Sequence, residues 1–232
     1  MADLIDVLIQ DGWLKTPRII EAFRAVKRLD FMPEDMRNLA ELNEALPIGY
    51  GQTISQPLVV AFMLELLAPE PGQKILDIGA GSGWTTALLA YIVGDERNKS
   101  DRGHKGYKGK VIAIELIPEL KEFGEKNVAK YNFLAPHRTR SGAGIEKGIV
   151  EFLCADGSRG YPKEAPFDRI LASASASEVP RAWKEQLKIG GRIVTPIRSS
   201  IWLFVKKGEE QFDETEYPGF AFVPFVVEKP SV

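Results

Sequence analysis

Three alternating glycines mark the segment with the strongest chemical signal, Asp77-Ile-Gly79-Ala-Gly81-Ser-Gly83-Trp84. The segment follows an apolar run typical of a buried strand and precedes an apolar run typical of a helix, so it forms a strand-to-helix turn. Backbone that lacks Cβ atoms can approach a ligand closely at such a turn. A dinucleotide fingerprint would place a third glycine where Trp84 stands, and a phosphate loop would need a lysine that is missing. The alternative is a tight turn that binds nothing.

An acid followed by three alternating glycines resembles the loop of S-adenosylmethionine-dependent methyltransferases, which implies S-adenosylmethionine as cofactor and S-adenosylhomocysteine as its product. In such folds an acid after the next strand accepts both ribose hydroxyls of the donor, and Glu115 occupies that place. An acid after the third strand lies near the adenine amino group, where Asp156-Gly157 stands. Without the glycine loop, Glu115 is typical of a solvated strand end and Asp156-Gly157 of a turn. The glycine loop, Glu115 and Asp156-Gly157 all follow predicted strands. Open α/β sheets bind ligands at the carboxyl ends of their strands.

The elements that must position these residues begin near residue 72, where apolar strand and helix patterns start to alternate. Strands are predicted at 74–78, 111–114, 150–154, 169–172, 191–196, 202–205 and 220–227, and helices at 84–93, 118–131 and 180–187. Repeated βα units with continuously apolar strands indicate an α/β fold whose mostly parallel, doubly wound, Rossmann-like sheet is covered on both faces. The last strands lack helices between them, which predicts an antiparallel edge.

The region before this alternation has helical periodicity, with Thr16 as a predicted N-cap before Pro17 and a helix at 57–67. Proline and glycines between residues 47 and 57 argue against regular structure there. We therefore expect one domain, 1–232, with a helical extension and active-site loop at 1–57 and the α/β core at 58–232. Two polar, glycine-rich stretches, 94–110 and 136–148, are predicted to be exposed insertions; the first is locally basic, so a patch for an anionic partner is the alternative.

Composition narrows the function classes. Thirty basic against thirty-two acidic residues give a net charge of −2, so no broad nucleic-acid footprint is expected. One cysteine, Cys154, and two histidines argue against a disulfide framework or a metal centre, and Cys154 is expected to be a buried strand residue. The most apolar stretch, 58–68, is too short to cross a bilayer, and no signal peptide is apparent. We expect a cytoplasmic protein without membrane contact.

Further motifs point to a particular acceptor. The segment Gly51-Gln-Thr-Ile-Ser55-Gln-Pro57, with Arg28–Pro33 before it, resembles the protein-L-isoaspartate (D-aspartate) O-methyltransferase family. The resemblance continues in the family's order through 156–160, 165–170, 187–192 and 222–225. It implies a monomeric enzyme with a seven-stranded sheet, which methylates the free carboxylate of L-isoaspartyl residues in damaged proteins and peptides. The ester then collapses to a succinimide, from which normal aspartate is partly recovered.

The resemblance also implies the site residues. Ser55 would orient the isoaspartyl carboxylate, although a serine before Gln-Pro is also typical of a helix N-cap. A carboxylate is already ionised at neutral pH, so attack on a sulfonium methyl needs no general base, and alignment suffices. The donor site would comprise Gly51, Gln52, Thr53, Asp77, Gly79, Ala80, Gly81, Ser82, Gly83, Glu115, Leu116, Asp156 and Gly157.

Two alternatives remain open: a methyltransferase acting on a small molecule, RNA or a specific protein, and a donor-binding module without catalysis. The intact 53–57 segment argues against the first alternative, and the near-neutral charge argues against RNA in particular. Against the second alternative stand the retained residues Asp77, Gly79, Gly81, Glu115 and Ser55. Three departures from the family pattern leave the donor site intact and bear on the peptide groove. Residues 37–46 lack the usual aromatic-acid pair, 94–110 is longer than usual, and Val226 follows Phe225, so any donor contact there must use backbone. The aromatic residues Trp84, Phe220, Phe222 and Phe225 are expected mainly in the core, although Trp84 could flank the donor pocket.

Overall fold

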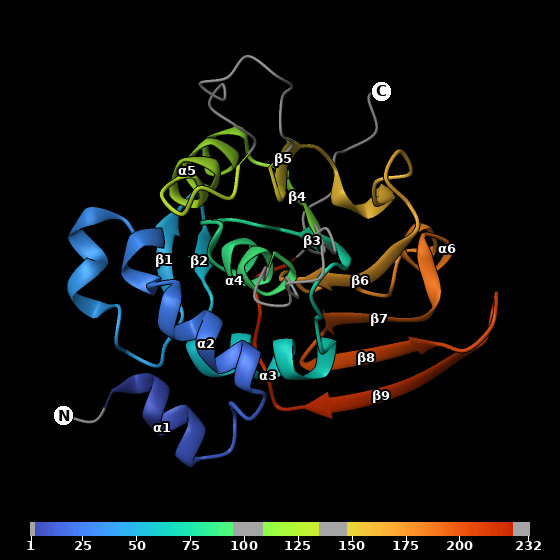
Figure 1. The fold of residues 1–232 in the computed structure, drawn as a ribbon, viewed down its shortest axis with the longest axis horizontal. Coiled ribbons are helices and arrows are strands. Elements are labelled where there is room, and N and C mark those ends of the chain that lie inside the picture. Colours follow the sequence, from blue (N-terminus) through green and yellow to red (C-terminus); the bar gives the residue numbers. More distant parts are fainter. Residues whose placement is uncertain (1–2, 95–108, 135–147, 225–232) are drawn as a thin grey trace, which may run out of the picture.

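A seven-stranded sheet forms the centre of the molecule in the computed structural model, which describes residues 3–94, 109–134 and 148–224. The strand order is β5-β4-β3-β6-β7-β8-β9 and can be followed from top to bottom in Figure 1. The strands are β3 (Lys74–Ile78), β4 (Lys110–Glu115), β5 (Val150–Cys154), β6 (Phe167–Ala172), β7 (Leu187–Ile197), β8 (Ser200–Lys206) and β9 (Phe212–Pro218). The first five of this order pair in parallel, and β8 and β9 are antiparallel, which confirms the predicted α/β class and its antiparallel edge.

Helices cover the sheet on both faces. They are α1 (Leu4–Gln10), α2 (Pro17–Ala25), α3 (Pro57–Leu67), α4 (Trp84–Val93), α5 (Pro118–Ala129) and α6 (Arg181–Glu185), with 3-10 turns η1 (Arg28–Phe31), η2 (Glu34–Leu39) and η4 (Gly157–Arg159). Successive side chains of a strand face opposite sides of a sheet. Ile75 of β3 therefore packs into a core with α2 to α5, whereas Leu76 and Ile78 pack into a second core with Trp183 of α6.

The strand order reverses direction beside β3. The chain passes from β3 outward to β4 and β5, and then returns to place β6 on the other side of β3. Such a switch point leaves an opening at the carboxyl ends of the two central strands, where α/β proteins bind ligands. The glycine loop follows β3 directly, so the fold places it at this opening.

The segment 47–57, predicted to be irregular, contains a β-hairpin. Strands β1 (Leu46–Gly49) and β2 (Gln52–Ile54) pair antiparallel around Tyr50 and Gly51. Both turn residues have positive φ, 54° and 70°, the geometry of the type I′ turns that suit hairpins. The prediction was wrong because it took the glycines as chain breakers, whereas one of them supplies the turn.

Thr16 occupies the N-cap position of α2 as predicted, although its hydroxyl donates to Glu65 Oε2 (2.7 Å) and makes no capping hydrogen bond. Two other local predictions need correction. The helix predicted at 180–187 is shorter, because Leu187 already starts β7. Cys154 is exposed, because β5 is an edge strand and Cys154 is its last residue.

The last predicted strand, 220–227, was placed wrongly. The edge strand is β9, and its side chains are all exposed or half-exposed, so it lacks the apolar pattern that the prediction relied on. Residues 220–224 form no strand, apart from a single bridge between Pro224 and Ser175, and 225–227 lie outside the described residues. Most of the two polar insertions, 95–108 and 135–147, also lies outside them. None of the described helices is long and apolar enough to cross a membrane.

Candidate active site

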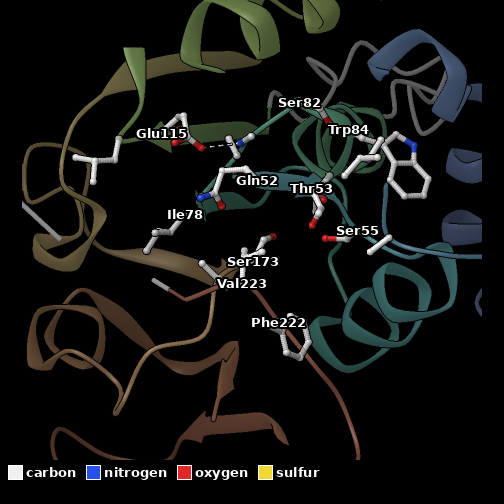
Figure 2. Close-up of a pocket in the computed structure, with 18 of the residues that line it drawn as sticks. Gln52, Thr53, Ser55, Ile78, Ser82, Trp84, Glu115, Ser173, Phe222 and Val223 are labelled. Carbon is white, nitrogen blue, oxygen red and sulfur yellow. Dashed lines mark hydrogen bonds between the residues drawn. The ribbon is translucent and has the colours of Figure 1, made fainter. Parts of the chain in front are cut away.

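A cavity of about 450 Å³ opens at the carboxyl ends of β3, β4 and β6 and extends to the hairpin. In Figure 2, Glu115 lies toward one end of it, and Thr53, Ser55 and Trp84 lie toward the other. Its wall consists of Ala45, Gln52–Gln56, Val59, Ile78–Ser82, Trp84, Thr85, Ile114–Ile117, Ala155, Gly157, Ser173, Ala174 and Ala221–Pro224. This volume is within the range of cofactor and small-ligand pockets.

Backbone hydrogen bonds to the sheet hold the glycine loop. The N–H groups of Gly79 and Ala80 donate to the Ile114 carbonyl at 2.9 and 3.1 Å. Gly83 has a φ of 84°, and a Cβ there would lie 2.7 Å from the Gly124 carbonyl oxygen of α5. Only glycine fits this contact, so Gly83 allows the loop to pack against α5. It is not among the residues that line the cavity.

Glu115 also holds the glycine loop in place through a hydrogen bond. Its buried carboxylate accepts the Gly81 N–H at Oε2 (2.8 Å) and the Ile117 N–H at Oε1 (3.0 Å), as Figure 2 shows in part. Each carboxylate oxygen can accept a further hydrogen bond, because it carries two lone pairs. A buried, acceptor-only group in the wall of a cavity fits a ligand with neighbouring hydroxyls, such as a ribose.

Asp77 lies beneath the loop, fully buried, and does not line the cavity. Its Oδ2 accepts the Thr86 hydroxyl (2.6 Å) from the first turns of α4, while Oδ1 has no hydrogen-bond partner in the described part of the chain. Burial raises the pKa of Asp77 to about 7; the Thr86 hydrogen bond opposes this shift and the charge of Glu115 adds to it. Asp77 therefore connects strand to helix and keeps one spare buried acceptor beside the loop.

The side of the cavity opposite Glu115 comes from the hairpin and the start of α3. Gln56, and not Ser55, occupies the N-cap position of α3, so the capping alternative for Ser55 is wrong. Half-buried Ser55 lines the cavity, and its hydroxyl makes no hydrogen bond within the described residues. Figure 2 shows this hydroxyl directed into the cavity near Thr53. It is therefore free to donate to a ligand.

The structure brings ten of the fourteen predicted residues together in one wall: Gln52, Thr53, Ser55, Gly79, Ala80, Gly81, Ser82, Glu115, Leu116 and Gly157. The other four predicted residues do not line the cavity. Gly51 is exposed at the hairpin tip, Asp77 and Gly83 support the loop, and Asp156 precedes η4, where its Oδ1 accepts the Ser158 N–H (2.9 Å). Among the described residues no cluster of His, Cys, Asp or Glu could hold a metal ion.

Sequence reasoning missed the wall opposite the hairpin. Ser173 and Ala174 follow β6, and Ala221–Pro224 run past them with the Ser175 N–H donating to the Val223 carbonyl (2.9 Å). The position of Ser173 and Ala174 could have been predicted from the sequence, because they follow a strand at the switch point. Phe222, expected in the core, both packs against the core and lines the cavity. Nothing local in the sequence indicates this return of the chain.

Comparison with known proteins agrees with the geometry. The sequence model of the protein-L-isoaspartate(D-aspartate) O-methyltransferase family matches residues 1–230. The protein-L-isoaspartate O-methyltransferase of Methanopyrus kandleri is 40% identical over 230 residues, which cover 97% of this chain and 91% of that protein. That of Staphylothermus marinus is 37% identical over 229 residues, with 97% and 93% covered.

The fold also matches a solved structure. A Plasmodium falciparum chain assigned as a protein-L-isoaspartate O-methyltransferase, in complex with S-adenosyl-L-homocysteine, superposes with a TM-score of 0.78 over 96% of each chain, at 21% identity. At that identity the match supports the fold alone. The match of the family model over nearly the whole length, together with relatives of this similarity, shows that the chain belongs to the protein-L-isoaspartate(D-aspartate) O-methyltransferase family.

Proposed function

We propose that this chain transfers the methyl group of S-adenosylmethionine to the free carboxylate of L-isoaspartyl residues in damaged proteins and peptides. The resulting ester collapses to a succinimide, whose hydrolysis returns part of the damage to normal aspartyl residues. One observation carries the proposal. A single cavity joins the glycine loop and Glu115 with Thr53 and Ser55, so a donor and an acceptor can meet in it.

The donor end of the cavity would be formed by the sheet. Glu115 would accept the ribose hydroxyls, the backbone of residues 79–82 would pass beside the amino-acid part of the donor, and Gly157 would border the adenine. Asp156 would reach the adenine amino group only through Oδ2, since Oδ1 already accepts the Ser158 N–H. The bound donor supplies a methyl group on a positively charged sulfur.

Ser55 would donate its hydroxyl proton in a hydrogen bond to one oxygen of the isoaspartyl carboxylate. The other oxygen attacks the methyl carbon, the carbon–sulfur bond breaks, and its electron pair remains on sulfur. Since the carboxylate is ionised at neutral pH, no proton has to be removed before attack. Alignment of the oxygen, carbon and sulfur and exclusion of water would then supply the rate enhancement.

The protein partners follow from the family, namely proteins and peptides that contain isoaspartyl residues. We propose that the chain acts on them as a monomer in the cytoplasm and without nucleic acid. The monomer comes from the family resemblance, and the location and the exclusion of nucleic acid come from composition. All three stay predictions, which sedimentation analysis, localisation of the tagged protein and an RNA-binding assay can test.

Two synthetic peptides that differ only in one L-isoaspartyl or normal aspartyl residue test the function. We expect methyl transfer to the isoaspartyl peptide alone, together with measurable donor binding. Donor binding with neither peptide methylated would favour another acceptor or a binding module. The absence of donor binding would contradict the proposed cofactor itself.

A further inference from the structure

A buried guanidinium lies directly behind the acceptor wall of the cavity. Arg28 of η1 has only 7% of its surface exposed. Its Nη1 donates to the carbonyl oxygens of Ala40 (3.1 Å) and Leu42 (3.0 Å), and its Nη2 donates to those of Glu44 (2.7 Å) and Ser55 (3.2 Å). One side chain therefore holds the backbone of two separate segments at the active site.

The partners of this charge are backbone dipoles. Within the described ranges Arg28 forms no ion pair with a carboxylate. Burial lowers the pKa of Arg28 to about 10, and the more distant Glu41 opposes this shift, so the side chain remains a cation at neutral pH. Four carbonyl oxygens around a planar fork require the fixed geometry of a guanidinium, which the point charge of a lysine cannot reproduce.

The segment that Arg28 holds is tied to the start of α3 by a second set of bonds. Asn43 Oδ1 accepts the Leu58 N–H (3.0 Å), and the Asn43 carbonyl accepts Gln56 Nε2 (2.9 Å). Ala45 and Gln56 line the cavity beside Ser55. Residues 40–45, which lack regular secondary structure, thus form the outer support of this wall.

Arg28 also contacts the residue that directly follows the glycine loop. Its guanidinium carbon lies 5.5 Å from the ring centre of Trp84, within the range of a cation–π interaction. Trp84 is the first residue of α4, follows the glycine loop directly, and lines the cavity. Arg28 therefore bridges the residue beside the loop and the backbone of Ser55.

We propose that Arg28 is a positioning residue for methyl transfer, which sets the place of Ser55 relative to the donor by gathering the carbonyls of the acceptor wall. It touches neither substrate and acts through Ser55 and the 40–45 segment. The proposal rests on the proposed function. A misplacement of about 1 Å can cost roughly 100-fold in rate, so a support of this kind has a measurable effect.

The test compares Arg28→Lys with a matched control, Arg169→Lys. Arg169 is also partly buried, donates to the backbone carbonyls of Leu67 (2.7 Å) and Asp168 (2.8 Å), and does not line the cavity. Burial likewise lowers the pKa of Arg169. For each variant we would measure the melting temperature, the donor Kd by calorimetry, and kcat and KM for the isoaspartyl peptide well below both melting temperatures.

We expect Arg28→Lys to lower kcat/KM for the peptide roughly 10- to 100-fold, mostly through kcat, with the donor Kd within about threefold of wild type. Arg169→Lys should lower the melting temperature comparably, with kcat/KM within about twofold. Equal activity losses in the two variants, an unchanged Arg28→Lys enzyme, or a loss confined to donor affinity would each overturn the positioning role.

If Arg28→Lys shows no cooperative unfolding transition, Arg28→Gln supports the same comparison, because an amide keeps two donors without a buried cation. A wild-type enzyme that methylates neither peptide refutes the proposed function. A wild-type enzyme that methylates the isoaspartyl peptide, with a fully active Arg28→Lys variant, refutes only the role of Arg28.

Discussion

The two ends of the cavity are built in different ways. At the proposed donor end, the glycine loop is hydrogen-bonded through its backbone to Ile114 of β4, and Glu115 is the last residue of the same strand. At the acceptor end, a small separate hairpin and the segment 40–45 are held by a few side chains, Arg28 and Asn43 among them. Donor geometry is therefore a property of the fold. We expect the geometry of the proposed acceptor end to depend on single residues, so that it can change while the fold and donor binding remain.

Two glycines that both have positive φ provide the most sensitive test of this difference between the two ends. Gly83→Ala should unfold or strongly destabilise the donor end, because the backbone φ of 84° is strained for alanine and the added Cβ would lie 2.7 Å from the Gly124 carbonyl oxygen. Gly51→Ala, at φ 70° with nothing within 4 Å of its Cβ, should cost only about 1–2 kcal/mol. The melting temperature and the donor Kd would be measured for both variants. Equal losses of melting temperature would show that contact with α5 is unimportant.

Removing the charge of Glu115 should affect the donor end alone. Glu115→Gln turns one acceptor into a donor that faces backbone N–H groups and the ribose, so we expect the donor Kd to rise about 10- to 100-fold. Glu119→Gln removes the same charge from an exposed position on α5 and serves as control. Calorimetric titration with the donor gives the Kd of both variants. An unchanged Kd in Glu115→Gln would remove this residue from the ribose site.

At the acceptor end, Ser55→Ala should reduce kcat roughly tenfold and leave the donor Kd nearly unchanged, because it deletes one hydrogen bond to a charged group and no donor contact. Steady-state kinetics with the isoaspartyl peptide, beside donor titration, separates the two. Ser55→Thr keeps the hydroxyl and should retain more activity than the alanine variant. Parallel losses of turnover and donor affinity would count against the orienting role.

The pH dependence of stability tests how the sheet supports the loop. The pKa of Asp77 is raised from 3.8 to about 7 in the folded chain, so between these values the folded state holds a proton that the unfolded state releases. Its contribution to the free energy of unfolding must fall as pH rises through this window. Asp77→Asn lacks this titration, so the wild-type melting temperature should decline relative to the variant from about pH 4 to pH 7. Parallel curves would refute the shift.

The same contrast explains what the sequence could predict. The donor end follows from local patterns: the apolar run at 74–78, the glycines after it, and Glu115 after the next strand. The acceptor end depends on residues distant in sequence. Arg28 acts on a backbone carbonyl 27 positions later, and 221–224 return beside Ser173 without a local signal. The strand β9 was missed because its exposed side chains carry no apolar alternation.

That edge strand has a consequence for a protein that handles damaged chains. Partly unfolded substrates expose extended segments, and an open sheet edge is a template for adding such a segment as a further strand. On β9 the side chains of Asp213, Glu214 and Glu216 are exposed and charged, and the first two pair with Lys207 and Lys184; charged side chains on an edge strand disfavour such addition. A damaged chain can then be engaged through its lesion at the cavity and released again, without being retained along the sheet.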